Sequence, residues 1–391
     1  MKEFDYFRPF EPVNLDSMRP EVERYFQVYD ARTDGNVAVF FIYMDESGLE
    51  ENFDKLRKAF YAKNLIPMLR TEGGEQLLLV LPKPKVRGKP AWVNVALLIA
   101  TVITTTLAGS LYWISNVAGN FDIAAGQVYL QMIMPSNLGW GFLSFAFPLM
   151  LIIGLHEFSH YYIAKRHGIA ASLPFFIPVP PVFAINLGTF GAVIGMRDPM
   201  PDRKSLLDVG IAGPLMSFFV SIPVIIVGLL LWRANPVFAP VVPEGELSHT
   251  FTIMSPLLFM LLQLLVKVPD GSLMHPTVFA GWVGLLVTAI NLLPAGQLDG
   301  GHIARALLGD RQRYASFFVV AAMLFLGLIG IPGLMQPYSG WLIMGLIVLL
   351  LGMRHPPPLN DITPLDSRRK WLGVLAVAIF IVSFVPIPMS G

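Results

Sequence analysis

Three ionisable residues lie inside a stretch of sequence that is otherwise typical of a membrane-spanning helix. His156, Glu157 and His160 form a His-Glu-x-x-His pattern within the apolar run from Trp140 to about Ala164. An ionisable group in hydrocarbon costs roughly 3 kcal/mol on insertion scales, so such groups usually have a function there. Two histidines four residues apart share one helix face and reach one ion, as tetrahedral zinc requires. The pattern therefore predicts a zinc site within the membrane.

The glutamate of this pattern is the expected general base. Zinc lowers the pKa of a bound water towards about 7, and Glu157 would take a proton from that water as it attacks a peptide carbonyl. The same carboxyl group would then pass a proton to the leaving amine. The chain contains no cysteine, so further metal ligands must be histidines or carboxylates.

Two histidines supply only two ligands, so we expect a third at the same depth in the membrane. Asp299, just beyond another apolar run, is the natural carboxylate ligand. An aspartate before two glycines also suits a helix cap, but together with the His-Glu pattern metal ligation is the preferred interpretation. Asn291 lies within the same run, where its amide could donate to a developing oxyanion or simply join two helices.

The composition predicts a polytopic membrane protein. Of the 391 residues, 54% are apolar and only 14% are charged. The net charge of +1, without a basic cluster paired with aromatic residues, gives no basis for nucleic-acid binding. The expected partners are the lipid bilayer and a membrane-anchored protein substrate, and the oligomeric state stays open.

Seven apolar runs are long enough, or nearly so, to cross a bilayer, which takes about 20 residues. They are 92–115, 140–164, 206–232, 277–293, 314–335, 338–353 and 371–386. The basic clusters between these runs fall on one side, so the positive-inside rule places the N-terminal region in the cytoplasm and the C-terminus opposite. The shorter run 253–266 is interpreted as re-entrant or interfacial. Prolines and glycines exclude a regular spanning helix at 173–194, which predicts a re-entrant, strand-like segment.

Residues 1–85 are densely charged and predict a small cytoplasmic α+β domain of ββαββ order. Two alternating hairpins, 26–44 and 65–81, flank a helix that begins near residue 49. With no histidine before position 156, this domain is a poor candidate for catalysis. It is either a regulatory or substrate-gating module or a plain cytosolic appendage. The fold class is therefore an all-α membrane domain, 86–391, behind a small α+β domain, with the catalytic core at about 139–310 and accessory spans at 314–386.

The His156-Glu157-x-x-His160 pattern and the Asn291-x-x-Pro294-x-x-x-x-Asp299-Gly300 pattern together resemble the site-2 protease family of intramembrane zinc metalloproteases. Gly-Thr-Phe-Gly-Ala-Val-Ile at 188–194 and Ala-Gly-Pro-Leu at 212–215 add to this resemblance, which covers about residues 90–310. It is closest to the archaeal, cyanobacterial and chloroplast branch that includes the gravitropism-deficient-and-yellow-green type. No PDZ domain and no plant-type Gly-Asn-Leu-Arg-Gly signature are present.

The resemblance implies that His156, His160 and Asp299 hold one Zn²⁺ ion, that Glu157 is the base and that Asn291 assists the transition state. It also implies an extended segment in the membrane that binds substrate, made of Gly188, Thr189, Phe190, Gly191, Ala192 and Val193. Its glycines expose backbone to which an unwound substrate could add as a strand, although a loop that merely fills the domain is the alternative. Gly213 and Pro214 are most simply packing and kink residues.

The expected function is regulated intramembrane proteolysis, in which a membrane-anchored substrate is cut near the cytoplasmic face. A catalytically idle zinc-containing scaffold or chaperone is the alternative. Structural zinc sites normally have four protein ligands, whereas three ligands and an adjacent glutamate favour an enzyme. A secondary transporter would show internal repeats, and none is evident.

Overall fold

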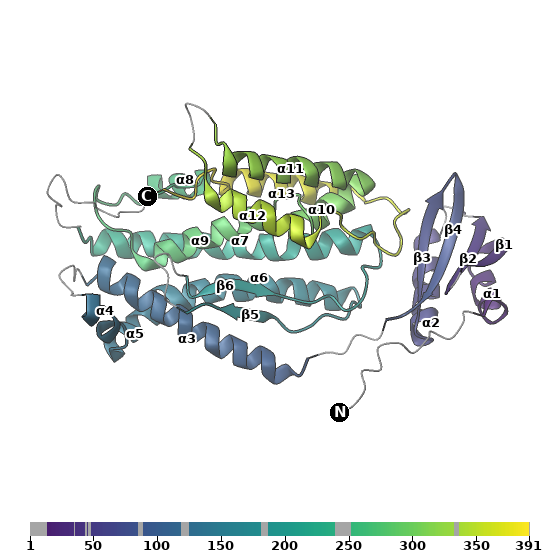
Figure 1. The fold of residues 1–391 in the computed structure, drawn as a ribbon, viewed down its shortest axis with the longest axis horizontal. Helices are drawn as coiled ribbons and strands as arrows, with labels where there is room; N and C mark the ends of the chain where they lie inside the picture. Colours follow the sequence, from purple (N-terminus) through teal and green to yellow (C-terminus); the bar gives the residue numbers. More distant parts are fainter. Residues whose placement is uncertain are drawn as a thin grey trace. The chain divides into compact units, whose positions relative to one another are not determined.

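The computed structural model describes residues 14–34, 36–43, 45, 48–84, 89–118, 125–180, 187–238, 252–331 and 336–390. Over these residues the chain is mostly helical, with a small sheet region near its N-terminus (Figure 1). It divides into two compact units. Unit 1 comprises residues 1–88, 198–206 and 356–366, and unit 2 comprises residues 89–197, 207–355 and 367–391.

Unit 1 holds a four-stranded antiparallel sheet of order β1-β2-β4-β3. Its elements are α1 (Leu15–Glu23), β1 (Gln27–Asp34), β2 (Val37–Tyr43), α2 (Leu49–Ala62), β3 (Leu65–Glu72) and β4 (Glu75–Pro82). Alternate residues of β2, Ala38, Phe40 and Ile42, are buried against a core that includes Phe53 and Leu56 of α2. This period of two is what a half-buried strand produces, so the alternation seen in the sequence reflects a real sheet face.

Two loops from distant parts of the sequence extend this sheet at its β3 edge. The backbone N–H of Leu69 donates to the Leu359 carbonyl at 2.8 Å, and the N–H of Leu359 donates to the Met200 carbonyl at 2.8 Å. Lys83 also forms an ion pair with Asp198, at 2.6 Å. The β3 edge is therefore paired, which removes an open strand edge that would otherwise invite association.

Unit 2 contains nearly all of the helical residues. They form α3 (Ala91–Asn116), α4 (Ala125–Met132), α5 (Pro135–Gly141), the π-helical turn η1 (Phe142–Ala146), α6 (Phe147–Arg166), α7 (Arg203–Ala234, which starts in unit 1), α8 (Leu257–Leu265), α9 (Pro276–Asn291), α10 (Asp299–Leu308), the 3-10 turn η2 (Gly309–Arg311), α11 (Gln312–Leu328), α12 (Ser339–Leu351) and α13 (Ser367–Ser383). Short strands pair as β5 (Phe175–Pro178) with β6 (Thr189–Val193) and β7 (Thr252–Ile253) with β8 (Met389–Ser390).

Among the residues that the structure describes, three helical stretches are long and apolar enough to cross a membrane: Ala91–Asn116, Pro135–Arg166 and Arg203–Ala234. They coincide with the first three of the seven apolar runs in the sequence. Pro276–Asn291 and Ser339–Leu350 are apolar but shorter. The structure thus supports a membrane protein with three candidate spans, and seven spans remain a prediction.

The proline-rich and glycine-rich segment forms the β5–β6 hairpin, which lies beside α3 and α6 (Figure 1). Thr104 of α3 donates through its hydroxyl to the Gly188 carbonyl at 2.6 Å, and Asn94 donates through its amide to the Leu173 carbonyl at 2.9 Å. A Cβ atom at Gly188 would lie 2.4 Å from the Cα atom of Thr105, so this close approach requires glycine. The segment is strand-like, as expected, while its depth in a membrane remains a prediction.

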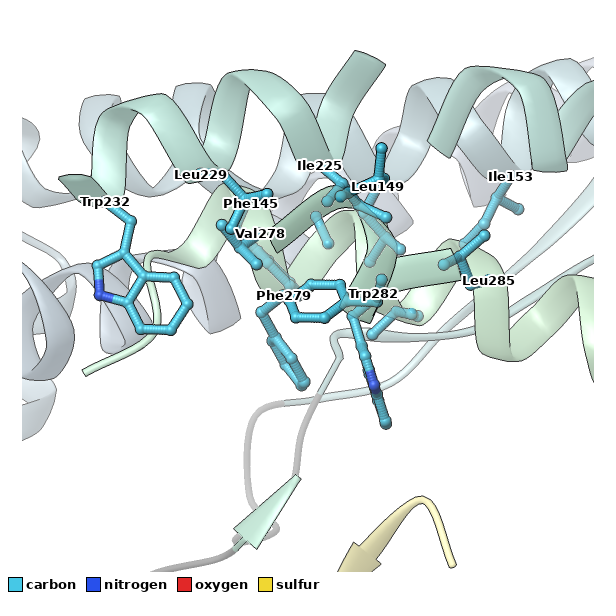
Figure 2. Close-up of a cluster of buried hydrophobic side chains, with 14 of the residues drawn as sticks. Phe145, Leu149, Ile153, Ile225, Leu229, Trp232, Val278, Phe279, Trp282 and Leu285 are labelled. Atoms are coloured by element: carbon cyan, nitrogen blue, oxygen red, sulfur yellow. The ribbon is translucent and has the colours of Figure 1, made fainter. Parts of the chain in front are cut away.

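The apolar core of unit 2 joins η1 and helices α6, α7 and α9 (Figure 2). It is built from Phe145, Leu149, Ile153, Ile225, Leu229, Trp232, Val278, Phe279, Trp282 and Leu285, with further residues around them. The Phe279 ring stacks on Trp282 and on Phe145, with centroids 5.7 and 5.9 Å apart. Because lipid is as apolar as these side chains, van der Waals packing rather than the hydrophobic effect holds helices together in a bilayer.

The helix that carries the His-Glu-x-x-His pattern begins with a π-helical turn whose cause is a proline. Pro148 has no N–H, so the Ser144 carbonyl lacks its usual donor four residues on. The N–H of Phe147 bonds instead to the Phe142 carbonyl, five residues back. The Thr277 hydroxyl of α9 donates to the freed Ser144 carbonyl at 2.6 Å. The turn therefore fastens the start of α6 to the start of α9.

Candidate metal site

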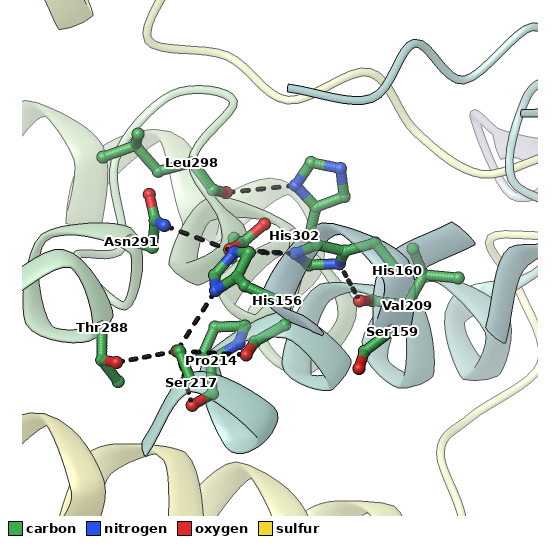
Figure 3. Close-up of polar contacts among 12 residues, drawn as sticks. His156, Ser159, His160, Val209, Pro214, Ser217, Thr288, Asn291, Leu298 and His302 are labelled. Carbon is green, nitrogen blue, oxygen red and sulfur yellow. Dashed lines mark hydrogen bonds and ion pairs between the residues drawn. The ribbon is translucent and has the colours of Figure 1, made fainter. Parts of the chain in front are cut away.

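The two histidines of α6 and the first residue of α10 meet in one cluster. The Nε2 atoms of His156 and His160 are 3.1 Å apart (Figure 3). The Oδ2 atom of Asp299 lies 3.2 Å from the His156 Nε2 atom and 3.3 Å from the His160 Nε2 atom. Both histidines are buried, and the Asp299 side chain is 17% exposed. The structure thus brings together the three residues that the sequence predicted as ligands.

These distances fit a tetrahedral zinc ion. Bonds of about 2.0–2.2 Å at tetrahedral angles place ligand atoms about 3.3–3.6 Å apart, close to the three edges of this triangle. Calcium takes six or more oxygen ligands at about 2.3–2.6 Å, which two imidazoles and one carboxylate do not provide. His156, His160 and Asp299 would supply three ligands to such an ion.

Asp299 faces the histidines because of how α10 begins. Its N-cap is Leu298, and the helix start has no capping bond from a side chain. A Cβ atom at Gly300 would lie 2.2 Å from the Leu292 carbonyl oxygen, so only glycine lets this turn close against the end of α9. The Asp299 carboxylate is therefore placed at the histidines, and it makes none of the bonds that the helix-cap alternative requires.

Both predicted catalytic residues lie beside the triangle. The Asn291 amide nitrogen is 3.4 Å from the Nε2 atom of His156, the atom that faces the metal position (Figure 3). Glu157 is 7% exposed and lies close enough to His160 and Asp299 to interact electrostatically with both. One acid and one amide donor thus lie close to the three residues.

Gly213 of α7 lies directly against the ligand atoms. A Cβ atom at this position would lie 2.1 Å from the Nε2 atom of His160 and 2.6 Å from that of His156. The sequence suggested only helix packing for Gly213, because nothing in Ala-Gly-Pro-Leu reveals which neighbour it faces. The structure shows that the two histidine Nε2 atoms occupy space that any side chain at position 213 would fill.

The site lies within a region that matches a known family. Residues 144–330 match the model of peptidase family M50. This region is an M50, site-2 protease, domain. The identification confirms the family resemblance carried by the His-Glu-x-x-His and Asp-Gly patterns, and all three predicted metal ligands lie inside the M50 domain.

Three plant proteins illustrate the similarity. The chain is 33% identical over 248 residues to "Probable zinc metalloprotease EGY1, chloroplastic" of Oryza sativa subsp. japonica, covering 62% of this chain and 40% of that protein. It is 31% identical over 258 residues to "Probable zinc metalloprotease EGY1, chloroplastic" of Arabidopsis thaliana, covering 63% of this chain and 43% of that protein. It is 28% identical over 242 residues to "Probable zinc metalloprotease EGY2, chloroplastic" of Arabidopsis thaliana, covering 61% and 41%. The chain thus spans less than half the length of these relatives. No solved structure matches.

The predicted substrate segment of the M50 domain forms the strand β6, next to α6 (Figure 1). Thr189 is buried, and its hydroxyl donates to the Ile177 carbonyl at 2.9 Å. Phe190 is 80% exposed and Val193 is 53% exposed. Gly188 and Gly191 both have positive φ angles, which favour glycine. β6 is thus anchored through Thr189, while Phe190 and Val193 expose large apolar side chains.

Other histidines lie outside the triangle. The His302 ring contacts the His355 ring edge-on, with centroids 4.3 Å apart, and its Nδ1 atom bonds to the Leu298 carbonyl at 3.1 Å. His167 pairs with Asp208, and His275 is the N-cap of α9. Within the part of the chain that the structure describes, His156, His160 and Asp299 are the one group of three residues suited to a metal ion.

Proposed function

We propose that this chain is an intramembrane zinc metalloprotease, which hydrolyses a peptide bond in or near a transmembrane segment of a membrane-anchored substrate. His156, His160 and Asp299 would hold the zinc ion, and the similar plant proteins are named as zinc metalloproteases. The observation that carries the proposal is the ligand triangle with edges of 3.1, 3.2 and 3.3 Å and Glu157 beside it. A purely structural zinc site normally has a fourth protein ligand, so this set favours an enzyme over an idle scaffold or chaperone.

The residues around the triangle have the chemistry that peptide hydrolysis needs. Zinc, when bound, supplies the Lewis acidity that makes water a nucleophile near neutral pH. Glu157 would remove a proton from the attacking water and deliver it to the leaving amine. The Asn291 amide would donate a hydrogen bond to the oxyanion that develops on the substrate carbonyl. Burial of the site strengthens each of these electrostatic interactions.

The β5–β6 hairpin is the proposed substrate-binding segment. A peptide bond inside a helix is shielded by the helix, so the substrate must unwind locally before it is cut. β6 pairs with β5 through Phe175↔Val193, Phe176↔Ala192 and Pro178↔Thr189. An unwound substrate would add to β6 as a further strand, and its side chains would meet the exposed Phe190.

The proposed topology follows the basic residues. Unit 1 would lie in the cytoplasm and the C-terminus on the opposite side, with cleavage near the cytoplasmic face. Residues 314–386 would be accessory spans. In unit 1, Met200 and Asp202 pair with Leu359 and Asn360 at the β3 edge, and they follow the end of β6 by only seven and nine residues. That short connection supports a gating or regulatory role for unit 1 rather than that of an unconnected appendage.

The decisive experiment compares wild-type protein with Glu157→Gln in lipid nanodiscs, using a fluorogenic transmembrane peptide as substrate. Glutamine keeps the shape of the side chain and removes the base, so cleavage should fall by about 10²–10⁴-fold. Zinc content, measured by mass spectrometry, should stay near one ion per chain. Glu75→Gln, which alters an exposed acid of unit 1, is the matched control and should cleave normally. Cleavage by Glu157→Gln at the wild-type rate would show that Glu157 is not the general base.

A further inference from the structure

The Nδ1 atoms of the two ligand histidines bond to partners of different kinds. The Nδ1 atom of His160 bonds to the Val209 backbone carbonyl at 2.7 Å. The Nδ1 atom of His156 bonds instead to the Ser217 hydroxyl at 3.2 Å (Figure 3). A backbone carbonyl is present whatever the side chain, whereas a hydroxyl can be removed by one substitution. The orientation of His156 therefore depends on a particular residue of α7.

The Ser217 hydroxyl is itself fixed by a second hydroxyl. Its Oγ atom lies 2.8 Å from the Oγ1 atom of Thr288 on α9, and Thr288 lies 2.7 Å from the Gly284 carbonyl. Ser217 also lies 3.2 Å from the carbonyl of Gly213, one turn earlier. Ser217 and Thr288 are both fully buried, so water does not substitute for these partners.

Counting hydrogens fixes the direction of the bond between His156 and Ser217. A neutral imidazole that binds a metal through Nε2 carries its hydrogen on Nδ1, so His156 must donate to Ser217. The single hydrogen of Ser217 can then go to Thr288, and that of Thr288 goes to the Gly284 carbonyl. Every donor is satisfied in this arrangement. If Ser217 instead donated to the Nδ1 atom of His156, the imidazole hydrogen would be on Nε2, where the metal must bind.

We propose that Ser217 and Thr288 are positioning residues that fix the tautomer and ring orientation of His156, so that its Nε2 atom is ready to bind zinc. This inference rests on the proposed function only through the identity of the metal. Partners of this kind typically change metal affinity by about 10–100-fold when they are removed. Removing the Ser217 hydroxyl, which bonds to the His156 ring, should lower zinc affinity more than removing the Thr288 hydroxyl, which acts through Ser217.

The test measures zinc affinity in the full-length protein by competition with a chromophoric chelator, without substrate. Ser217→Ala should bind zinc about 10–100-fold more weakly than wild type. Ser221→Ala is the matched control, because Ser221 is equally buried, lies one turn away on α7 and donates only to the Ser217 carbonyl among its described bonds. Its zinc affinity should stay within about threefold of wild type, since its loss leaves the histidine partner in place.

Thr288 supplies a second, independent pair of variants. Thr288→Val keeps the shape of the side chain and removes the hydroxyl. Zinc affinity should therefore fall by a few fold, which is about the effect of losing one neutral hydrogen bond. Thr288→Ser keeps the hydroxyl and should restore affinity towards wild type. Thermal unfolding of the metal-free proteins should be alike for Ser217→Ala and Ser221→Ala, which separates folding from metal binding.

Equal zinc affinity in Ser217→Ala and Ser221→Ala would overturn the inference, as would a wild-type protein that binds no zinc. Because no substrate enters the measurement, its outcome is separate from the protease proposal. A wild-type protein that binds zinc and cleaves nothing would contradict the proposed function while leaving the role of Ser217 intact.

Discussion

The two halves of helices α6, α7 and α9 are packed in opposite ways. In one half large side chains such as Leu149, Leu229 and Trp282 interlock, and the helices meet through aromatic rings and branched aliphatic groups. In the other half Gly213 and Ser217 stand where large residues would otherwise be, and the helices meet through histidine rings and hydroxyls. The same three helices thus combine a space-filling core with a polar site.

The difference teaches which half tolerates change. A core built from many apolar contacts accepts substitutions that keep volume, because no single contact dominates. The site half depends on single atoms at fixed distances, so one added methyl group can abolish it. The following predictions test this contrast, beginning with the largest expected effect.

Gly213→Ala should abolish the metal site. The added Cβ atom would lie 2.1 Å from the His160 Nε2 atom, so the histidine or the helix must move. Zinc content and peptide cleavage should both fall to background, as measured by mass spectrometry and the nanodisc assay. Gly154→Ala on α6 is the matched control, since its Cβ atom would meet only the Phe176 ring, at 4.0 Å. If both variants retained zinc, the claim that Gly213 makes room for the ligands would fail.

Trp282→Ala should affect stability and leave metal binding largely unchanged. Trp282 is fully buried, and its indole N–H donates to the Met254 carbonyl at 2.9 Å. Removing such a side chain typically lowers the free energy of unfolding by about 3–5 kcal/mol. Denaturant titration in detergent measures this change, with Trp371→Ala, which alters a 72% exposed side chain, as control. Equal stability of the two variants would show that the core half is not what holds the helices together.

Asn291→Ala should slow peptide cleavage while zinc remains bound. The loss of one donor to a developing oxyanion typically costs about 10²–10³-fold in kcat. Asn137→Ala on α5 removes an amide that bonds only to Gln131 among its described partners, and it should cleave normally. An unchanged kcat in Asn291→Ala would instead support the alternative that this amide simply joins helices.

The sequence predicted much of this arrangement because strong patterns carried it. The alternation in β1–β2 and β3–β4 predicted the two hairpins, and the first three apolar runs predicted the three long helices. The spacing of His156 and His160 and the Asp-Gly-Gly turn predicted a ligand set that the structure brings together. Each of these signals is local, so it can be read without knowing the fold.

Features that depend on neighbours distant in the sequence could not be predicted. Helix α1 has only nine residues and carries Pro20 in its interior, so a helix was not predicted there. The pairing of β3 with residues 359 and 360 depends on two segments nearly 300 positions apart. Gly213 was predicted to be a packing residue, and Ser217 and Thr288 were assigned no role, because only the crossing of α6, α7 and α9 places them against the histidines.

The zinc content of Asp299→Ala tests the central claim most directly. Asp299 is the proposed ligand from a distant part of the chain, and its Oδ2 atom lies 3.2 and 3.3 Å from the Nε2 atoms of the two histidines. Wild type and Asp270→Ala, which alters an exposed loop acid, should each hold one zinc ion per chain after dialysis against a weak chelator. Asp299→Ala should hold almost none. Full zinc occupancy in Asp299→Ala would contradict the account and require a different third ligand.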